Sequence, residues 1–150
     1  MSRTPHLYGA TFTIIENDKG EILLQKRLNT GYYDGWYSLP SGHIEDWEFT
    51  SESIIHEMEE ELGIQIDPQK NKLVHVLHRL DHDRQYFDIC YVVDNWEGTI
   101  TNKEPEKCSE LLWCDPKNLP EHTAPPAVRF ITSYIQHWKN MVFSEVDTRE

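Results

Sequence analysis

Apolar residues recur along this chain with two different spacings, which separate predicted strands from predicted helices. Short runs of continuous or alternating apolar and β-branched residues predict strands. These runs cover residues 8–16, 21–27, 73–80, 86–93 and 110–114. The sequence NDKG at 17–20 predicts a turn between the first two strands, and residues 81–85 join the next pair. Residues 28–41 and 115–126, rich in Gly, Asn, Asp, Tyr or Pro, are predicted to be irregular.

Two further segments carry apolar residues at the spacing of a helix. The first begins at Thr50 or Ser51, either of which can cap it, and runs to about Leu62, where Gly63 terminates it. Its apolar stripe consists of Ile54, Ile55, Met58 and Leu62. The second helix is predicted over residues 127–141. Its stripe consists of Val128, Ile131, Ile135 and Trp138.

Strands in adjacent hairpins, together with two helices, predict an α/β or α+β layered domain. A chain of 150 residues can bury roughly 70% of the surface that its unfolded form exposes, which is enough for one core. The sequence contains no internal repeat, low-complexity tract or linker. Residues 1–150 are therefore predicted to form a single domain.

The net charge of −12 narrows the classes of partner. It opposes binding to nucleic acid polymers and anionic membranes, and a small polyphosphate would need cations to approach. The three cysteines, Cys90, Cys108 and Cys114, indicate neither a disulfide framework nor a C-x-x-C metal site. Since we recognise no signal peptide and no apolar run long enough to cross a bilayer, we expect a cytoplasmic protein.

Residues 42–64 read GHIEDWEFTSESIIHEMEEELGI and contain a regularly spaced set of glycines and glutamates. Against the pattern G-x5-E-x7-R-E-U-x-E-E-x-G-U, where U is a bulky apolar residue, eight of the nine specified positions match. The matching residues are Gly42, Glu48, Glu57, Met58, Glu60, Glu61, Gly63 and Ile64. His56 stands where the pattern has arginine.

This segment resembles the Nudix box, the signature of the Nudix (MutT-like) hydrolases. The similarity extends less sharply over residues 9–120. It implies a Nudix-type α/β/α sandwich, in which a mixed β-sheet lies between helices.

The glutamates of the box suggest a metal site on physical grounds. Glu57, Glu60 and Glu61 share one face of the predicted helix because of their i, i+3, i+4 spacing. Like charges this close cost about 0.2–0.5 kcal/mol per pair on an exposed helix. A hard cation such as Mg²⁺, which prefers oxygen ligands, would turn this cost into binding energy. A solvated acidic helix face is the alternative interpretation.

The resemblance assigns roles to the residues of this site, with Mg²⁺ as cofactor and Mn²⁺ as its substitute. Glu60 and Glu61 would be the principal ligands. Glu57 would bind metal and position or deprotonate the attacking water. Glu48 would be an auxiliary ligand, and the carbonyl of Ser41 would join the shell.

Further substrate contacts are expected from Arg27, Gly42, Tyr33, Trp36, Glu104 and Glu110. Arg27 resembles the phosphate-contacting arginine of the family, the alternative being a solvated strand end. Gly42 leaves room for the backbone to approach a metal or phosphate. Glu104, or else Glu110, would complete the metal or water site, unless both belong to an ordinary acidic loop. Tyr33 and Trp36 would stack on a base, or else pack their loop onto the core.

The Nudix family hydrolyses a nucleoside diphosphate linked to another group, X. Residues 104–113 resemble a segment of nucleotide-sanitising members. This favours a (d)NTP, an oxidised purine nucleotide among them, cleaved to NMP and pyrophosphate. Because relatives are commonly homodimers, a homodimer is expected beside the small-molecule nucleotide.

His56 leaves a second function open. Its imidazole is shorter than an arginine side chain, has no fork and is largely neutral at pH 7–8. The chain could therefore be a weakened enzyme, a differently supported one, or a non-catalytic nucleotide-binding or regulatory module. A prenyl diphosphate isomerase is a third possibility. The run His75, His78, His82 does not favour zinc, because strand alternation puts the first two on opposite faces.

Overall fold

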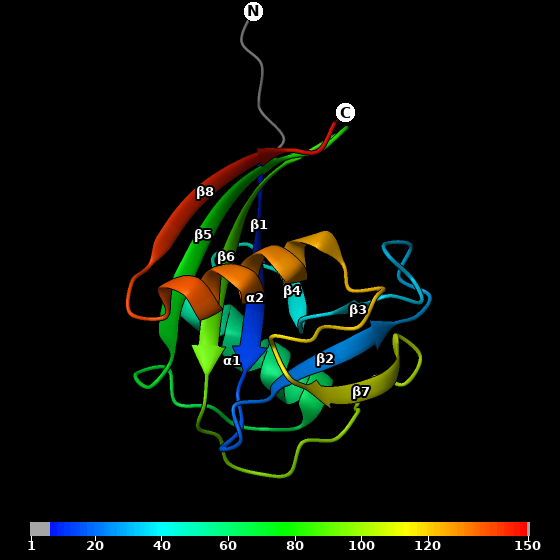
Figure 1. Cartoon of the computed structure of the whole chain (residues 1–150), viewed down its shortest axis with the longest axis vertical. Helices are drawn as coiled ribbons and strands as arrows, with labels where there is room; N and C mark the ends of the chain where they lie inside the picture. Colours follow the sequence, from blue (N-terminus) through cyan, green and yellow to red (C-terminus); the bar gives the residue numbers. More distant parts are fainter. Residues whose placement is uncertain (1–6, 150) are drawn as a thin grey trace, which may run out of the picture.

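The computed structural model describes residues 7–149, which form eight strands and two helices (Figure 1). The elements are β1 (Leu7–Ile15), β2 (Ile22–Arg27), β3 (Tyr37–Ser38), β4 (Ser41–His43), α1 (Thr50–Leu62), β5 (Lys72–Leu80), β6 (Gln85–Val93), β7 (Cys108–Cys114), α2 (Pro125–His137) and β8 (Val142–Asp147). No helix within the described range is long and apolar enough to cross a membrane.

The strands divide into two sheets. The larger has the order β4-β1-β6-β5-β8, and the smaller has the order β3-β2-β7. In the larger sheet β1 runs parallel to β6 and β5 parallel to β8, whereas β5 and β6 are antiparallel. The mixed sheet predicted from the Nudix resemblance is therefore confirmed.

The two helices cover opposite faces of the larger sheet, with α2 in front and α1 behind in Figure 1. Helix α1 buries Ile54, Met58 and Leu62 completely against Ile15 and Val93. Each such side chain contributes about 1.5–3 kcal/mol when it leaves water. On the other face, α2 packs its buried residues Ala127, Phe130 and Ile131 onto β1, β5 and β6. The layered α/β sandwich follows from these two apolar faces.

The predicted hairpin between the first two strands is wrong. The turn itself forms, since the Gly20 amide donates to the Asn17 carbonyl at 3.0 Å. Beyond a single bridge between Glu16 and Ile22, however, the two strands separate into different sheets. Both edges of β1 are occupied by β4 and β6, so β2 pairs with β3 and β7 instead.

The C-terminal helix ends earlier than predicted, at His137, and strand β8 follows it. The expected stripe is also rotated, because Val128 and Trp138 are 37% and 56% exposed. The residues that face the sheet are Pro126, Ala127, Phe130 and Ile131. Strand β8 is half-buried at the edge of the sheet, beside β5, which explains its weak apolar signal.

Candidate active site

A cleft of about 850 Å³ opens where helix α1, both sheets and two loops meet. One wall consists of Glu57, Glu60 and Glu61 from α1. Strands β1 and β4 contribute Ala10, Phe12, Ser41, Gly42 and His43. The opposite wall comes from β2 and the loop after it, including Gln25, Arg27, Thr30 and Tyr32. Asn102, Glu104 and Lys107 close a third side.

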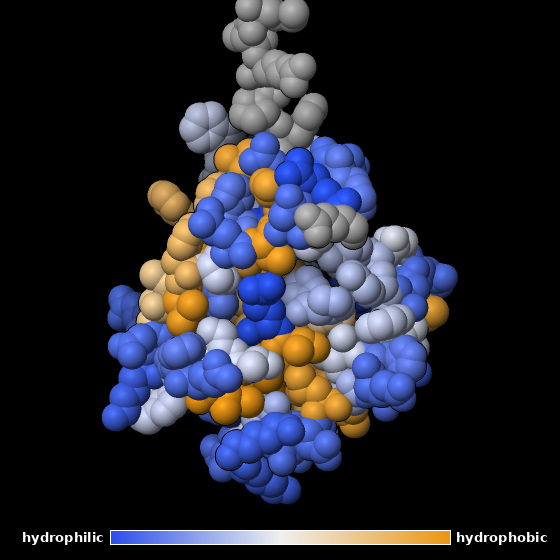
Figure 2. All heavy atoms as spheres, turned by 45° about the horizontal axis from the view of Figure 1, so that its top comes forward, coloured by the Kyte–Doolittle hydropathy of each residue, from blue (hydrophilic) through white to orange (hydrophobic). Residues whose placement is uncertain are grey.

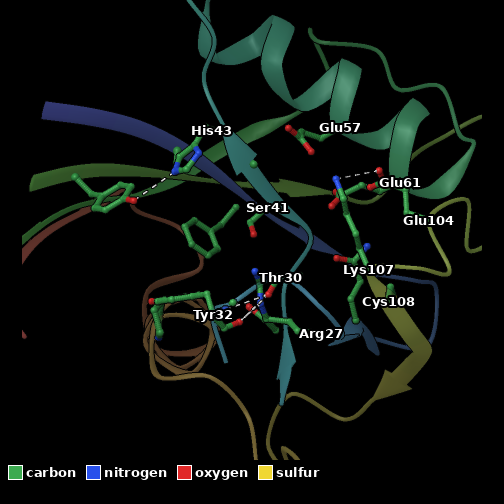
Figure 3. Close-up of a pocket in the computed structure, with 18 of the residues that line it drawn as sticks. Arg27, Thr30, Tyr32, Ser41, His43, Glu57, Glu61, Glu104, Lys107 and Cys108 are labelled. Carbon is green, nitrogen blue, oxygen red and sulfur yellow. Dashed lines mark hydrogen bonds and ion pairs between the residues drawn. The ribbon is translucent and has the colours of Figure 1, made fainter. Parts of the chain in front are cut away.

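The three glutamates of α1 line the cleft because the opposite stripe of the helix is buried. Ile54 and Met58 seat the helix on the sheet, which turns the i, i+3, i+4 carboxylates outward into the cleft. Figure 3 shows Glu57 and Glu61 pointing from the helix toward Ser41 and the opposite wall. Helix α1 ends at Gly63, whose φ of 68° suits a glycine cap.

Burial and crowding perturb these carboxyl groups strongly. Burial, and then the negative charge of Glu60, raises the pKa of Glu57 to about 7. Burial, and then the charge of Glu57, raises the pKa of Glu61 well above its ordinary value of 4.5. No lysine or arginine stands in the helix to offset these charges. The site therefore has a deficit of positive charge.

Two further observations show that these residues fit a hard cation. Glu61 Oε2 is buried, yet it has no hydrogen-bond partner among residues 7–149. A Cβ at Gly42 would lie only 1.8 Å from Glu57 Oε1, so the absence of a side chain there makes space for the carboxylate. Among the described residues, no three acidic, histidine or cysteine groups already converge as a ready-made cage. Mg²⁺ is usually held by one or two carboxylates, with waters and substrate phosphates completing its shell.

Positive charge faces the carboxylates across the cleft. Arg27 Nε donates to the Tyr32 carbonyl at 2.5 Å, and its guanidinium lies 5.4 Å from the centre of the Tyr32 ring. Burial lowers the pKa of Arg27, but an arginine stays cationic in proteins. On the third side, Lys107 Nζ lies 3.8 Å from Glu104 Oε2. Figure 3 shows Lys107 reaching toward the region of Glu61. These two cations are placed to meet a polyphosphate.

The NUDIX domain family model matches residues 6–134 of this sequence. The chain belongs to the Nudix family. The 8-oxo-dGTP diphosphatase of Escherichia coli (strain K12) is 29% identical over 114 residues, which are 75% of this chain and 87% of that protein. The ADP-ribose pyrophosphatase of Methanocaldococcus jannaschii is 32% identical over 129 residues, 85% of this chain and 72% of that protein.

The fold agrees with a solved Nudix structure. The crystal structure of a MutT NUDIX hydrolase from Burkholderia pseudomallei superposes with a TM-score of 0.77, covering 87% of this chain and 98% of that one. Its sequence identity of 24% supports the fold alone. Together with the family match, these similarities identify the chain as a Nudix hydrolase of the pyrophosphatase class.

The Nudix box departs from its pattern at His56, and the structure shows what the imidazole does. His56 Nδ1 lies 2.6 Å from Glu48 Oε2, and Glu48 Oε1 accepts from the Glu45 amide at 3.1 Å. The hydrogen bond from Glu45, followed by that from His56, lowers the pKa of Glu48, and Glu48 raises the pKa of His56. Glu48 does not line the cleft. It is a hydrogen-bond partner of His56, and its charge also helps to raise the pKa of Glu57, so its role as an auxiliary ligand stays a prediction.

Two acidic residues downstream of the box take different positions. Glu104 lines the cleft as expected, held by Asn102, whose Oδ1 accepts from the Glu104 amide at 3.1 Å. Glu110 lies outside the cleft lining, and its Oε2 accepts from the Tyr37 hydroxyl at 2.8 Å. The structure therefore separates the two candidates in favour of Glu104.

The expectation for the aromatic loop is corrected as well. Tyr33 and Trp36 do not line the cleft; Trp36 packs on His122, with ring centres 5.0 Å apart, and on Tyr33. Tyr32 lines the cleft instead. The loop curls around Asp34, which accepts three hydrogen bonds from Thr30 and Gly31. The packing of Trp36 agrees with the alternative expectation, in which these rings pack their loop, and a short sequence pattern does not reveal the curl that brings Tyr32 to the cleft.

Sequence reasoning also missed three cationic residues of the cleft, Lys107, Arg79 and Arg84. Lys107 offers a weak signal in its i, i+3 spacing from Glu104. Arg79 offers none, since it stands in an ordinary strand pattern. The histidine run behaves as strand alternation predicts: His75 is buried beside Ser144, whereas His78 stacks on Phe87.

Proposed function

We propose that this Nudix hydrolase cleaves a nucleoside triphosphate to the monophosphate and pyrophosphate, with Mg²⁺ as cofactor. The observation that carries the proposal is the crowding of Glu57 and Glu61 at the cleft, opposite Arg27 and Lys107. A cation and a polyphosphate together would satisfy both charged walls. The 8-oxo-dGTP diphosphatase among the relatives supports this substrate class, with an oxidised purine nucleotide as one form.

The roles of the residues follow from their positions. Glu57, Glu60, Glu61 and the Ser41 carbonyl would hold the cation. Mg²⁺ held there would neutralise phosphate oxygens and support the leaving oxygen. Glu57 would accept a proton from the water as its oxygen attacks phosphorus. The phosphorus–oxygen bond to the departing pyrophosphate breaks in the same displacement.

The remaining cleft residues bind the substrate. Arg27 is fixed by the loop carbonyl of Tyr32, so its free N–H groups can hold phosphate oxygens without further ordering. Lys107 can exchange its partner Glu104 for a phosphate, which frees that carboxylate for the water or the cation. The absence of a side chain at Gly42 keeps the backbone accessible beside Glu57. The homodimer and the cytoplasmic location stay predictions.

Product analysis of a nucleotide panel tests the proposal. The panel contains the ribo- and deoxynucleoside triphosphates, 8-oxo-dGTP and ADP-ribose, each incubated with the protein and Mg²⁺. We expect nucleoside monophosphate and pyrophosphate from at least one triphosphate, and loss of this activity on chelation. Glu57→Gln and Glu61→Gln should each lower kcat by about 10²-fold or more.

Glu59→Gln is the matched control, because Glu59 lies on the same helix but is exposed and outside the cleft lining. It should retain the activity of the unmodified protein. Equal losses of kcat in Glu57→Gln, Glu61→Gln and Glu59→Gln would show that the total charge of α1 controls activity, and not the carboxylates that line the cleft. Binding of nucleotide with Mg²⁺ but no product from any substrate would instead support the non-catalytic module that His56 left open.

A further inference from the structure

Arg79 is a buried cation at the cleft that the proposed chemistry does not use. It stands on β5, is 6% exposed and lines the cleft. Its Nε donates to Asp88 Oδ2 at 2.8 Å and its Nη2 to Asp88 Oδ1 at 3.4 Å. Its guanidinium also lies 4.1 Å from the centre of the Tyr86 ring. These contacts hold the planar group in one orientation.

Strand register places Arg79 away from the metal end of the cleft. Gly42, where an added Cβ would meet the Glu57 carboxylate, pairs with Thr11 on β1. Tyr8, three residues earlier on β1, pairs with Tyr86, and Tyr86 pairs with Arg79. Three residues of a strand span roughly 10 Å, and the step from β1 across β6 to β5 adds further distance. This separation is comparable to that between the phosphates and the base of an extended nucleotide.

The charge balance argues against a phosphate-binding role for Arg79. Asp88 is fully buried and already neutralises the guanidinium. Burying such a pair costs desolvation, and apolar residues of similar size often replace it without loss of stability. The pair therefore need not be present for stability, and its position at the wall of the cleft allows a role in recognition.

The hydrogen bonds left over on Arg79 define what it can recognise. A guanidinium has five N–H donors and no acceptor. Among residues 7–149, two donate to Asp88 and one to Asp81 at 3.5 Å, which leaves two. At C6 of a purine or C4 of a pyrimidine, a donor-only group favours the carbonyl oxygen of guanine, uracil or thymine and leaves the amino group of adenine or cytosine without an acceptor.

We propose that Arg79, held by Asp88, reads the nucleobase and selects nucleotides whose base has a carbonyl oxygen, and not an amino group, at C6 of a purine or C4 of a pyrimidine. This inference rests on the proposed function, because it assumes that the phosphates lie at the carboxylate end. It makes Arg79 a specificity-determining residue and Asp88 its positioning residue. Guanine, with adjacent O6 and N7 acceptors, matches the two free donors most completely.

Calorimetric binding tests this without requiring turnover. The probes are the α,β-methylene diphosphates of guanosine, uridine, adenosine and cytidine, measured with Mg²⁺. We expect the guanosine and uridine compounds to bind roughly tenfold or more tightly than the other two. A guanosine analogue that lacks the 6-oxygen, the 2-aminopurine compound, should bind as weakly as the adenosine compound. This comparison needs no altered protein.

Arg79→Met should remove the selectivity, so that the guanosine compound binds no more tightly than the adenosine compound. Because that variant strands a buried carboxylate, Arg79→Met with Asp88→Asn is measured beside it, and both are checked by thermal unfolding. Arg129→Met is the control: Arg129 is an exposed arginine on α2 outside the cleft lining, so selectivity should persist.

Equal or tighter binding of the adenosine compound by the unmodified protein would overturn the inference, as would selectivity that survives both Arg79 variants. Hydrolysis of adenine and guanine nucleotides at equal rates would leave the proposed function standing while this inference fails. Selective binding of the guanosine compound, without hydrolysis of any nucleotide, would support this inference while the proposed function fails.

Discussion

At the scale of single residues, His56 decides how well Glu48 is held. One hydrogen bond of 2.6 Å joins the imidazole to Glu48, and the imidazole is exposed. An arginine could hold the same carboxylate through two parallel bonds and would keep its charge at every working pH. His56→Arg should therefore raise kcat several-fold, measured as initial rates of pyrophosphate release.

The same substitution in a Glu48→Gln background is the control, since the carboxylate that the arginine would hold is then gone. The gain should disappear there. An unchanged or lower kcat for His56→Arg alone would show that orientation at this position does not limit the enzyme.

Gly42 gives a second prediction at this scale. A methyl group added there would collide with the far end of the Glu57 side chain, which can swing away at little cost to folding. Gly42→Ala should then lower kcat by roughly tenfold or more while the Tm changes little. Gly9→Ala is matched to it, because its Cβ would meet the flexible end of Ile44 at 2.9 Å, away from the carboxylates. If Gly42→Ala keeps full activity, Glu57 does not need its present position.

At the scale of elements, α1 and the β5–β6 hairpin could be predicted from the sequence. The apolar stripe of α1 and its glycine cap are local signals, and the structure confirms the helix and its carboxylate face. Its amino end differs slightly, since Phe49 occupies the cap position and Thr50 bonds to Tyr91. The pairing of β2 and the strand β8 could not be predicted, because both depend on partners far along the chain.

The site was predictable to the same extent. The box fixes Glu57, Glu60 and Glu61 by local spacing, and all three line the cleft. Tyr32 lines the cleft because its loop curls around Asp34, and Arg79 lines it because of the register between β5 and β6. A short sequence pattern encodes neither feature.

His75, buried on β5 beside α2 and β8, predicts that the free energy of unfolding falls in acid. Burial, followed by the positive charges of Arg129 and His137, lowers the pKa of His75 below 6.5. Below about pH 6.5 the unfolded chain therefore binds a proton that the folded chain does not, so the free energy of unfolding falls. His75→Gln, which can still reach Ser144, should remove this part of the loss between pH 7.5 and 5.5 in urea titrations.

His82→Gln provides the comparison, since His82 lies in the turn between β5 and β6 and is exposed. It should leave the acid response of the protein unchanged. An identical pH dependence for His75→Gln and the unmodified protein would assign the acid sensitivity to other groups.

At the scale of the whole molecule, β8 lies beyond the residues that match the Nudix family and supplies no residue to the described cleft lining. It does cover the edge of β5 and bonds Ser144 to His75. Deleting residues 141–150 should lower the Tm by roughly 5 °C or more, because half-buried Val142 and Val146 are lost. Hydrolysis measured below the new Tm should persist; its loss would mean that β8 shapes the site.

Most of the surface view in Figure 2 is hydrophilic, with apolar residues exposed in the central part of that face. This surface fits a chain of net charge −12 that acts on a small ligand. That residues 1–150 form a single domain stays a prediction. Such a charge makes the cation central to the account, because no polyphosphate would enter this cleft readily without one.

Binding of Mn²⁺, followed by electron paramagnetic resonance in the presence of an uncleavable nucleotide, tests that central claim most directly. The account predicts saturable binding to the unmodified protein and to Glu59→Gln, weakened by about tenfold or more in Glu61→Gln. Equal binding by all three proteins, or none by any of them, would contradict a cation held by the carboxylates of α1.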